Sequence, residues 1–342
     1  MEQEHLWTEV TRTLKEAADQ GFVGNKGIGL DVYDARCQLV YSQTFGNFSR
    51  KKHYQIGSAS KWITTTVLLS LVNDGILSLE DTTAKWLEWK GKKGEITVRH
   101  LMSLTSGFHI PPMEAPRYFY DQGESLKSCT DSVCRDYELI GAPGKIASYG
   151  PAGFIIAGRI AEVATGKQWS HIFWERLGDP LGFDRENTRY DPPQQLAGSL
   201  VMSMEEYGRF LEMINNRGSY RGKRILNPEL IGEQMKDQWA SNTRIESSPY
   251  SVINRSFHYG LGVWRECPDL SDIEACDRGL IVTCAGMFGW YPWIDMKNNS
   301  YGLLAMVKRF GSTPPGYVVA FRLLEKLRPI INSTLVKPRT GE

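Results

Sequence analysis

The chain has 342 residues, a net charge of +1 from 40 Lys and Arg against 39 Asp and Glu, and 41% hydrophobic residues. This balance, with no basic stripe among the aromatic residues, argues against a nucleic-acid partner. The longest apolar runs, such as Val67 to Val72, are much shorter than a membrane span. From the polar start, Met1 to His5, we expect no signal peptide in the chain as given, and a processed mature form would look the same. The length is enough for one large domain or two interleaved lobes.

Six cysteines include two close pairs in polar, loop-like stretches, Cys129 with Cys134 and Cys267 with Cys276. Such pairs suggest disulfides and therefore a periplasmic or secreted protein; reduced thiols in a cytoplasmic protein are the alternative. Neither pair is accompanied by the second pair of ligands that a zinc site needs. We expect no metal and no cofactor.

The first half of the chain alternates strand and helix patterns. Residues 4–19 predict a helix, and 27–33 with 38–44 predict a β-hairpin. An apolar helix follows Ser58, and a short helix is predicted after the cap residue Thr97. The segment up to residue 142 has an irregular pattern that is typical of a flap or cleft wall, so we expect region 110–140, with Tyr118, Phe119 and Tyr120, to set specificity.

The second half begins with helix patterns and ends with strand patterns. Helices are predicted over 152–165, 169–177, 204–215 and 228–238, β-type runs over 259–264, 280–283, 289–294 and 301–308, and a terminal helix over 318–327. Strands at both ends with helices between them predict an α+β fold with one antiparallel sheet built from both termini. We expect a sheet lobe of 1–57 with 246–342, a mainly helical lobe of 58–245, and an active site between them.

Ser58 and Lys61 stand three residues apart at the start of the apolar helix, which places a hydroxyl and an amine on one face of its first turn. Burial of the lysine would favour its neutral form, and a neutral amine can serve as the base that activates serine. The alternative is that Ser58 is an ordinary helix cap and Lys61 points into water. A second copy of this spacing, Ser49 with Lys52, lies in a charged run that we interpret as a solvated loop.

Several motifs in order make the chain resemble the penicillin-recognising serine hydrolases, the group of class C β-lactamases, D-alanyl-D-alanine carboxypeptidases and family VIII esterases. The resemblance rests on Ser58-Ala59-Ser60-Lys61, His100 to Gly107, Pro180-Leu181-Gly182, Ala197 to Ser203, Gly222 to Pro228 and Tyr259-Gly260-Leu261-Gly262. It covers nearly the whole chain. It implies a β-lactamase/transpeptidase-like fold and catalysis through an acyl-enzyme.

The second motif of the family, Tyr-x-Asn, matches in part. By resemblance Tyr149 assists proton transfer together with Lys61, whereas a lone tyrosine in a loop would otherwise be a structural aromatic residue. Pro151 stands where relatives carry Asn. Because proline has neither a side-chain amide nor an N–H, it cannot make the contact to a substrate amide.

The third motif of the family, Lys-Thr-Gly or His-x-Gly, corresponds to Cys284-Ala285-Gly286, which we assign to substrate binding by resemblance. Relatives use a backbone N–H of this strand as the second oxyanion donor after that of the nucleophile. Here these donors would be on Ser58 and on Met287, the latter assigned to within one residue. Cys284 replaces the cation, and taken alone it is a small buried residue more often than a nucleophile.

The loss of cation and Asn removes the stronger contacts to a substrate carboxylate. We therefore expect a serine hydrolase acting on an ester or amide that needs no carboxylate, with a small molecule or short peptide-like substrate. The alternatives are a D-amino-acid amidase or peptidase, a weak β-lactamase, an acyltransferase, or a catalytically silent relative that binds ligands. The sequence assigns no oligomeric state.

Overall fold

The computed structural model describes residues 2–24, 26–110, 124–267 and 273–335. Its helices are α1 (Glu2–Asp19), α2 (Ser60–Asn73), α3 (Thr83–Leu87), α4 (Gly91–Gly94), α5 (Val98–Met102), α7 (Leu126–Asp136), α8 (Ala152–Thr165), α9 (Trp169–Phe173), α10 (Met204–Asn215), α11 (Pro228–Met235), α12 (Ile273–Arg278) and α13 (Gly316–Leu335). The other described helical segments are η1 (Gly57–Ala59), the π-helical η2 (Trp174–Gly178) and η3 (Pro249–Ile253).

The main sheet combines strands from both ends of the chain, as predicted. Its strands are β1 (Ile28–Tyr33), β2 (Leu39–Phe45), β10 (His258–Tyr259), β11 (Trp264–Glu266), β12 (Ile281–Thr283), β13 (Tyr291–Asp295) and β14 (Ser300–Met306). They pair antiparallel in the order β10-β11-β12-β13-β14-β1-β2. The α+β fold class expected from the sequence is thereby confirmed.

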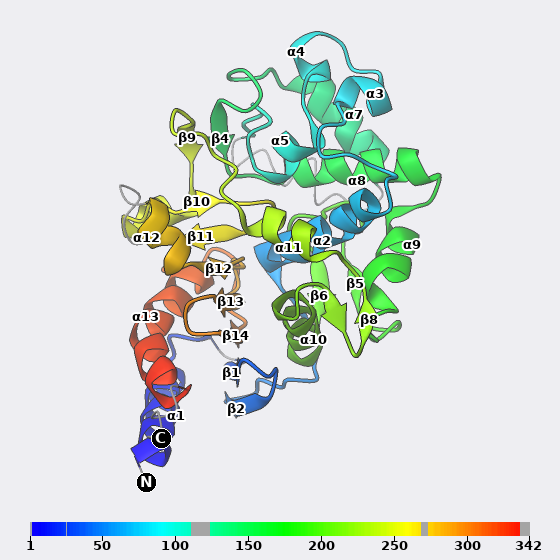
Figure 1. Ribbon diagram of the computed structural model, residues 1–342. Coiled ribbons are helices and arrows are strands. Elements are labelled where there is room, and N and C mark those ends of the chain that lie inside the picture. Colours follow the sequence, from blue (N-terminus) through cyan, green and yellow to red (C-terminus); the bar gives the residue numbers. More distant parts are fainter. Residues whose placement is uncertain (1, 25, 111–123, 268–272, 336–342) are drawn as a thin grey trace.

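Helices cover both faces of this sheet, which explains why β1, β13 and β14 are buried along their whole length. Helices α1 and α13 pack side by side, and α13 contacts β13 and β14, which α10 also contacts (Figure 1). The predicted terminal helix, 318–327, is confirmed as α13, which is longer than predicted and extends over Gly316–Leu335. Strand β2 forms an edge of the sheet and is the more exposed partner of the predicted hairpin.

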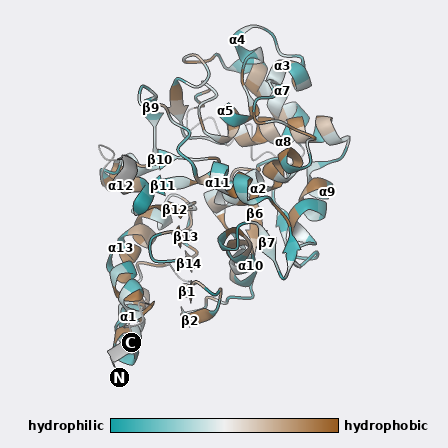
Figure 2. Ribbon diagram, in the orientation of Figure 1, coloured by the Kyte–Doolittle hydropathy of each residue, from teal (hydrophilic) through white to brown (hydrophobic). Residues whose placement is uncertain are grey.

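The middle of the chain is mostly helical, with short strands in small sheets: β3 (Tyr54–Gln55), β4 (Ile146–Ser148), β5 (Arg189–Tyr190), β6 (Leu200–Met202), β7 (Ser219–Tyr220), β8 (Lys223–Arg224) and β9 (Arg244–Ser247). Helix α2 is buried from Ser60 to Leu71, as expected of a helix that is apolar all round. It packs against α8, whose ribbon is mostly hydrophobic in Figure 2. The predicted bounds of α8 agree with those observed.

Two predictions for this part of the chain are wrong. The stretch before residue 142 holds helix α7, where an irregular segment was expected; Ser125 and Ser128 form a capping box, a weaker signal than Ser with Glu. The expected strand over 259–264 is two short strands joined by a turn. Gly262 has a φ of +74°, and a Cβ there would lie 2.1 Å from Thr65 Oγ1. The backbone of the turn therefore packs directly against helix α2. Tyr118, Phe119 and Tyr120 lie outside the described residues.

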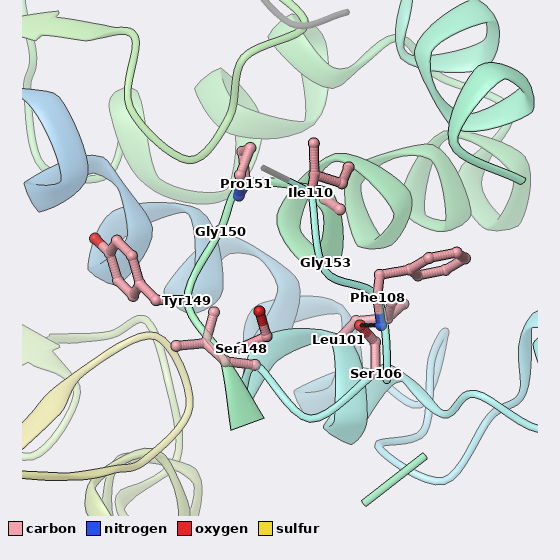
Figure 3. A pocket seen from close by; sticks show the side chains of 11 residues that line it. Leu101, Ser106, Phe108, Ile110, Ser148, Tyr149, Gly150, Pro151 and Gly153 are labelled. Carbon is pink, nitrogen blue, oxygen red and sulfur yellow. Dashed lines mark hydrogen bonds between the residues drawn. The ribbon is translucent and has the colours of Figure 1, made fainter. Parts of the chain in front are cut away.

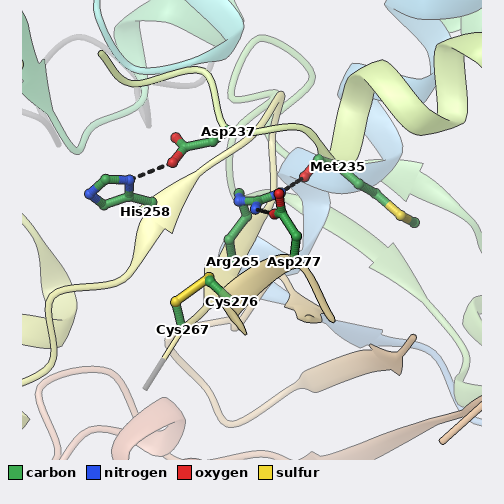
Figure 4. The surroundings of a disulfide bond; sticks show 7 residues. All are labelled: Met235, Asp237, His258, Arg265, Cys267, Cys276 and Asp277. Atoms are coloured by element: carbon green, nitrogen blue, oxygen red, sulfur yellow. Dashed lines mark hydrogen bonds and ion pairs between the residues drawn. A yellow bond between two sulfur atoms is a disulfide. The ribbon is translucent and has the colours of Figure 1, made fainter. Parts of the chain in front are cut away.

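The cysteine pairs behave differently from each other. Cys267 and Cys276 form a disulfide beside the ion pair of Arg265 with Asp277 (Figure 4). Cys129 and Cys134 are not bridged, so that prediction is wrong. Both lie on helix α7, where residues five apart point in directions roughly 140° apart and their sulfurs cannot meet.

Candidate active site

Ser58 lies in a tight helical turn, η1, immediately before α2. Hydrogen bonds from two side chains hold the backbone of this turn in place. The Ser60 hydroxyl donates to the Gly57 carbonyl at 2.6 Å, and the buried Tyr207 hydroxyl donates to the Ala59 carbonyl at 3.0 Å. Ala59, not Ser58, is the N-cap residue of α2. The alternative that Ser58 simply caps this helix is therefore wrong, and its side chain is available for chemistry.

Lys61 is only 3% exposed, and its amine lies 3.0 Å from the Ser58 hydroxyl oxygen. The amine also donates a hydrogen bond to the Ala197 carbonyl at 2.9 Å. Burial lowers the pKa of Lys61 to about 8. Roughly one amine in ten is then neutral at pH 7 and about half at pH 8, and this neutral form can act as a general base for serine.

Tyr149 follows strand β4 and is brought to the same place by tertiary contacts. Its backbone N–H donates to Ser247 on β9, and its ring stacks on Trp264 with centres 5.6 Å apart. The Lys61 amine lies 4.7 Å from the centre of the Tyr149 ring. Serine, lysine and tyrosine are thus grouped as the motifs predict.

Tyr149 is part of the wall of a small pocket. The pocket is lined by Leu101, Leu104, Ser106, Phe108, Ile110 and residues 148–153. Figure 3 shows the Tyr149 ring extending away from Ser106 and Phe108. His109 Nδ1 lies 2.9 Å from the Ser148 hydroxyl, so these two side chains brace the strand that carries Tyr149. His100 bonds the backbone N–H of Thr97 in a capping box, which is a structural role.

The third motif approaches the Ser58 turn from the sheet, just after β12. A Cβ on Gly286 would lie 2.0 Å from the Ile56 carbonyl oxygen, and a Cβ on Gly57 would lie 2.9 Å from the Met287 nitrogen. The two backbone segments therefore touch, and only glycine permits this approach. Within the described part of the chain no backbone carbonyl accepts a hydrogen bond from the Met287 N–H.

Cys284 and Ala285 are both buried, and the Cys284 thiol donates to the Ser58 carbonyl at 3.1 Å. Burial raises the pKa of Cys284 to about 12, which keeps the thiol neutral. The Cys284 side chain therefore faces the turn that holds the nucleophile and is closed off from solvent. The aromatic cluster Trp290, Tyr291 and Trp293 that follows is fully in the core.

Three contributors to the site were not predicted from the sequence. Ala197 belongs to a motif that carried the resemblance, but no role was assigned to its carbonyl. Trp264 and Ser247 had no local signal, because their contacts with Tyr149 bridge about 100 residues of chain. The second serine and lysine spacing, at Ser49 and Lys52, lies exposed at the surface as expected.

The described ranges contain no group of three or more His, Cys, Asp or Glu side chains arranged to hold a metal ion. Among the same residues, no helix combines the length and apolar character needed to cross a membrane.

The fold and the grouped serine, lysine and tyrosine define a β-lactamase-like class of protein. The family model described as Beta-lactamase matches residues 20–327, and the chain belongs to this family. It is similar to penicillin-binding protein 4 of Amycolatopsis lactamdurans, 31% identical over 51% of this chain and 45% of that protein. It is also similar to lovastatin esterase of Penicillium rubens, 29% identical over 50% of each. The chain thus matches about half the length of these curated relatives.

A crystal structure from Bacteroides dorei DSM 17855, provisionally named a beta-lactamase, covers the chain more completely. It has a TM-score of 0.79 and 28% identity, and the match spans 94% of this chain and 98% of the other. Proteins with this fold include esterases, amidohydrolases and acyltransferases. Sequence relatives of the chain include proteins named as an esterase and as a hydrolase.

Proposed function

We propose that the protein is a serine hydrolase that forms an acyl-enzyme with a carboxylic ester or amide lacking a required carboxylate. The observation that carries the proposal is the 3.0 Å contact between the Lys61 amine and the Ser58 hydroxyl, made by a lysine whose pKa is lowered to about 8. A buried lysine that serves only structure would be expected to pair with a carboxylate. Its two side-chain hydrogen bonds here go to a hydroxyl and a carbonyl.

The chemistry follows from the positions of these groups. Neutral Lys61 accepts the Ser58 proton while the serine oxygen attacks the substrate carbonyl carbon. The backbone N–H groups of Ser58 and Met287 hold the negative charge that develops on the carbonyl oxygen. The proton passes through Lys61 or Tyr149 to the leaving alcohol or amine as the carbon–oxygen or carbon–nitrogen bond breaks. A water molecule then releases the acyl group by the same steps.

The two-lobe division is part of the proposal. Ser58 and Lys61 come from the start of the helical lobe, 58–245, and Met287 comes from the sheet lobe, 1–57 with 246–342. A substrate carbonyl would thus bind where the lobes meet. The proposed substrate is a small molecule or a short peptide-like compound.

The absent cation and Asn support a substrate that needs no carboxylate. Cys284 is buried, and the Pro151 side chain has no polar group, so neither side chain can pair with a carboxylate. A relative with an esterase name supports an ester. A relative named teichoic acid D-alanine hydrolase and a neighbour of the same fold named D-stereospecific amidohydrolase support D-amino-acid substrates, and with them the main alternative, a D-amino-acid amidase or peptidase. Transfer of the acyl group to an alcohol is a further variant of the same chemistry.

Intact-protein mass spectrometry after treatment with a fluorophosphonate tests the proposal. The wild type should gain one adduct and hydrolyse short-chain p-nitrophenyl esters, and Ser58→Ala should lose both. Ser49→Ala is the matched control, because Ser49 has the same spacing to a lysine but lies at the surface. D-amino-acid p-nitroanilides, nitrocefin and added alcohols then separate the substrate classes. A folded wild type with neither adduct nor turnover would favour the silent ligand-binding relative.

A further inference from the structure

Helix α2 starts without the side-chain cap that most helices have. The first backbone N–H groups of a helix have no partner within it, and a Ser, Thr, Asp or Asn at the N-cap normally bonds that of the second or third residue. The N-cap residue here is Ala59, whose side chain offers no acceptor. The N-cap side chain therefore makes no bond to the corresponding N–H groups, those of Lys61 and Trp62.

The Cys284 sulfur approaches the Ser58 turn from the neighbouring sheet. Burial raises the pKa of its thiol, and the backbone N–H groups of Lys61 and Trp62 act in the opposite direction. The thiol itself donates to the Ser58 carbonyl at 3.1 Å. One buried side chain thus links the segment after β12 to Ser58, two residues before helix α2.

We propose that Cys284 is a positioning residue that fixes the Ser58 turn for acyl transfer through its hydrogen bond to the Ser58 carbonyl. This rests on the proposed function of Ser58. The thiol touches only the backbone of the nucleophile and acts through it. It holds Ser58 and Lys61 in one rigid unit, so that hydroxyl and amine stay in contact.

The neutrality of the thiol suits this position. A carboxylate here would attract a proton to Lys61 and so remove the base. A neutral thiol can hold the Ser58 carbonyl without this effect. Cys284 therefore differs from the family cation in charge and contacts the backbone of the nucleophile.

Two substitutions separate this role from simple space filling. Cys284→Ser keeps a donor and acceptor at the position, and Cys284→Ala removes both. We expect Cys284→Ala to lower kcat for a p-nitrophenyl ester, and the rate of fluorophosphonate labelling, about tenfold, the equivalent of one hydrogen bond. KM should change little, because the thiol does not touch substrate. Cys284→Ser should restore most of the rate.

The pH profile and a matched thiol make the test specific. The midpoint of kcat/KM against pH should stay where it is in the wild type, because the thiol is neutral. Cys129→Ala, which removes a buried thiol on helix α7, should leave labelling and turnover unchanged. Circular dichroism shows whether each variant is folded, and active-site titration gives the concentration of active enzyme by which the rates are divided.

The outcomes separate the two proposals. Wild-type labelling rates in folded Cys284→Ala would overturn the positioning role, as would a moved pH midpoint. If Cys284→Ala does not fold, folded Cys284→Ser must label at close to the wild-type rate, and slow labelling would overturn the role. Failure of the wild type to label at all would instead contradict the proposed function, so the two failures are distinguishable.

Discussion

The Ala197 carbonyl accepts a hydrogen bond from the Lys61 amine at 2.9 Å, and this contact orients the amine toward the nucleophile. A neutral lysine amine has two N–H donors and one lone pair. With one N–H directed at Ala197, the lone pair can face the Ser58 hydroxyl at 3.0 Å. A single backbone carbonyl thereby helps the lysine to accept a proton rather than donate one.

Activity should rise with pH through the pKa of Lys61. Burial lowers this pKa to about 8, so the amine is mostly protonated below that pH and cannot accept the Ser58 proton. We expect kcat/KM for an ester to increase about tenfold per pH unit well below the pKa and to level off above it. The measurement is a profile from about pH 6 to 10, which brackets the lowered pKa and approaches that of an unperturbed lysine, with Ser58→Ala as the blank. A profile that is flat or falls across this range would contradict lysine as the base.

Tyr149→Phe should lower kcat while leaving the fold intact. Phenylalanine keeps the ring that stacks on Trp264 and lies beside Lys61, and it removes only the hydroxyl. The loss of a proton-transfer group costs roughly 100- to 1,000-fold in rate. Steady-state kinetics with p-nitrophenyl esters measure it. Tyr41→Phe, which removes a hydroxyl bonded to Thr11 far along the sheet edge, is the control. Near wild-type turnover in Tyr149→Phe would assign the proton transfers to Lys61 alone.

Local sequence patterns were sufficient for much of the fold. The hairpin of β1 and β2 and the helix α8 follow from alternation, apolar periodicity and the terminating Gly166, all of which act within a few residues. The contact of Ser58 with Lys61 was also predictable, since residues three apart share a face in a helical turn. Strand patterns at both ends of the chain then predicted the sheet that joins the two termini.

The remaining features depend on contacts between distant segments. The split of residues 259–264 into two strands follows from the packing of Gly262 against Thr65 on α2, which no local pattern encodes. The orientation of the Cys284 thiol toward Ser58 is likewise set by how β12 meets α2. The cysteines of α7 were misassigned because a polar helix with a serine cap resembles a loop in sequence.

Alkylation should distinguish the two cysteine pairs. Under denaturing, non-reducing conditions we expect Cys37, Cys129, Cys134 and Cys284 to react, because only Cys267 and Cys276 are bridged. Reduction should add two further alkyl groups, which intact mass detects and peptide mapping assigns. Formation of this disulfide in the native host would support a periplasmic or secreted location. A peptide that links Cys129 to Cys134 would contradict the helical placement of that pair.

Gly286→Ala should damage both stability and labelling, because the new Cβ would lie 2.0 Å from the Ile56 carbonyl oxygen. The strand must move away from the Ser58 turn, and the Met287 N–H moves with it. Overpacking of this kind lowers the free energy of unfolding by about 1–3 kcal/mol. Chemical denaturation measures this loss, and fluorophosphonate labelling of the folded variant measures the damage to the site.

Gly232→Ala is the matched control for this substitution. Gly232 lies within helix α11, and a Cβ there would meet no atom within 4 Å. Alanine in a helix interior is more favourable than glycine by roughly 0.5–1 kcal/mol, so this variant should be slightly more stable and label normally. If Gly286→Ala matched Gly232→Ala in both measurements, the close approach of the third motif to the Ser58 turn would not be needed for activity. A selective loss in Gly286→Ala would support the Met287 N–H as the second oxyanion donor.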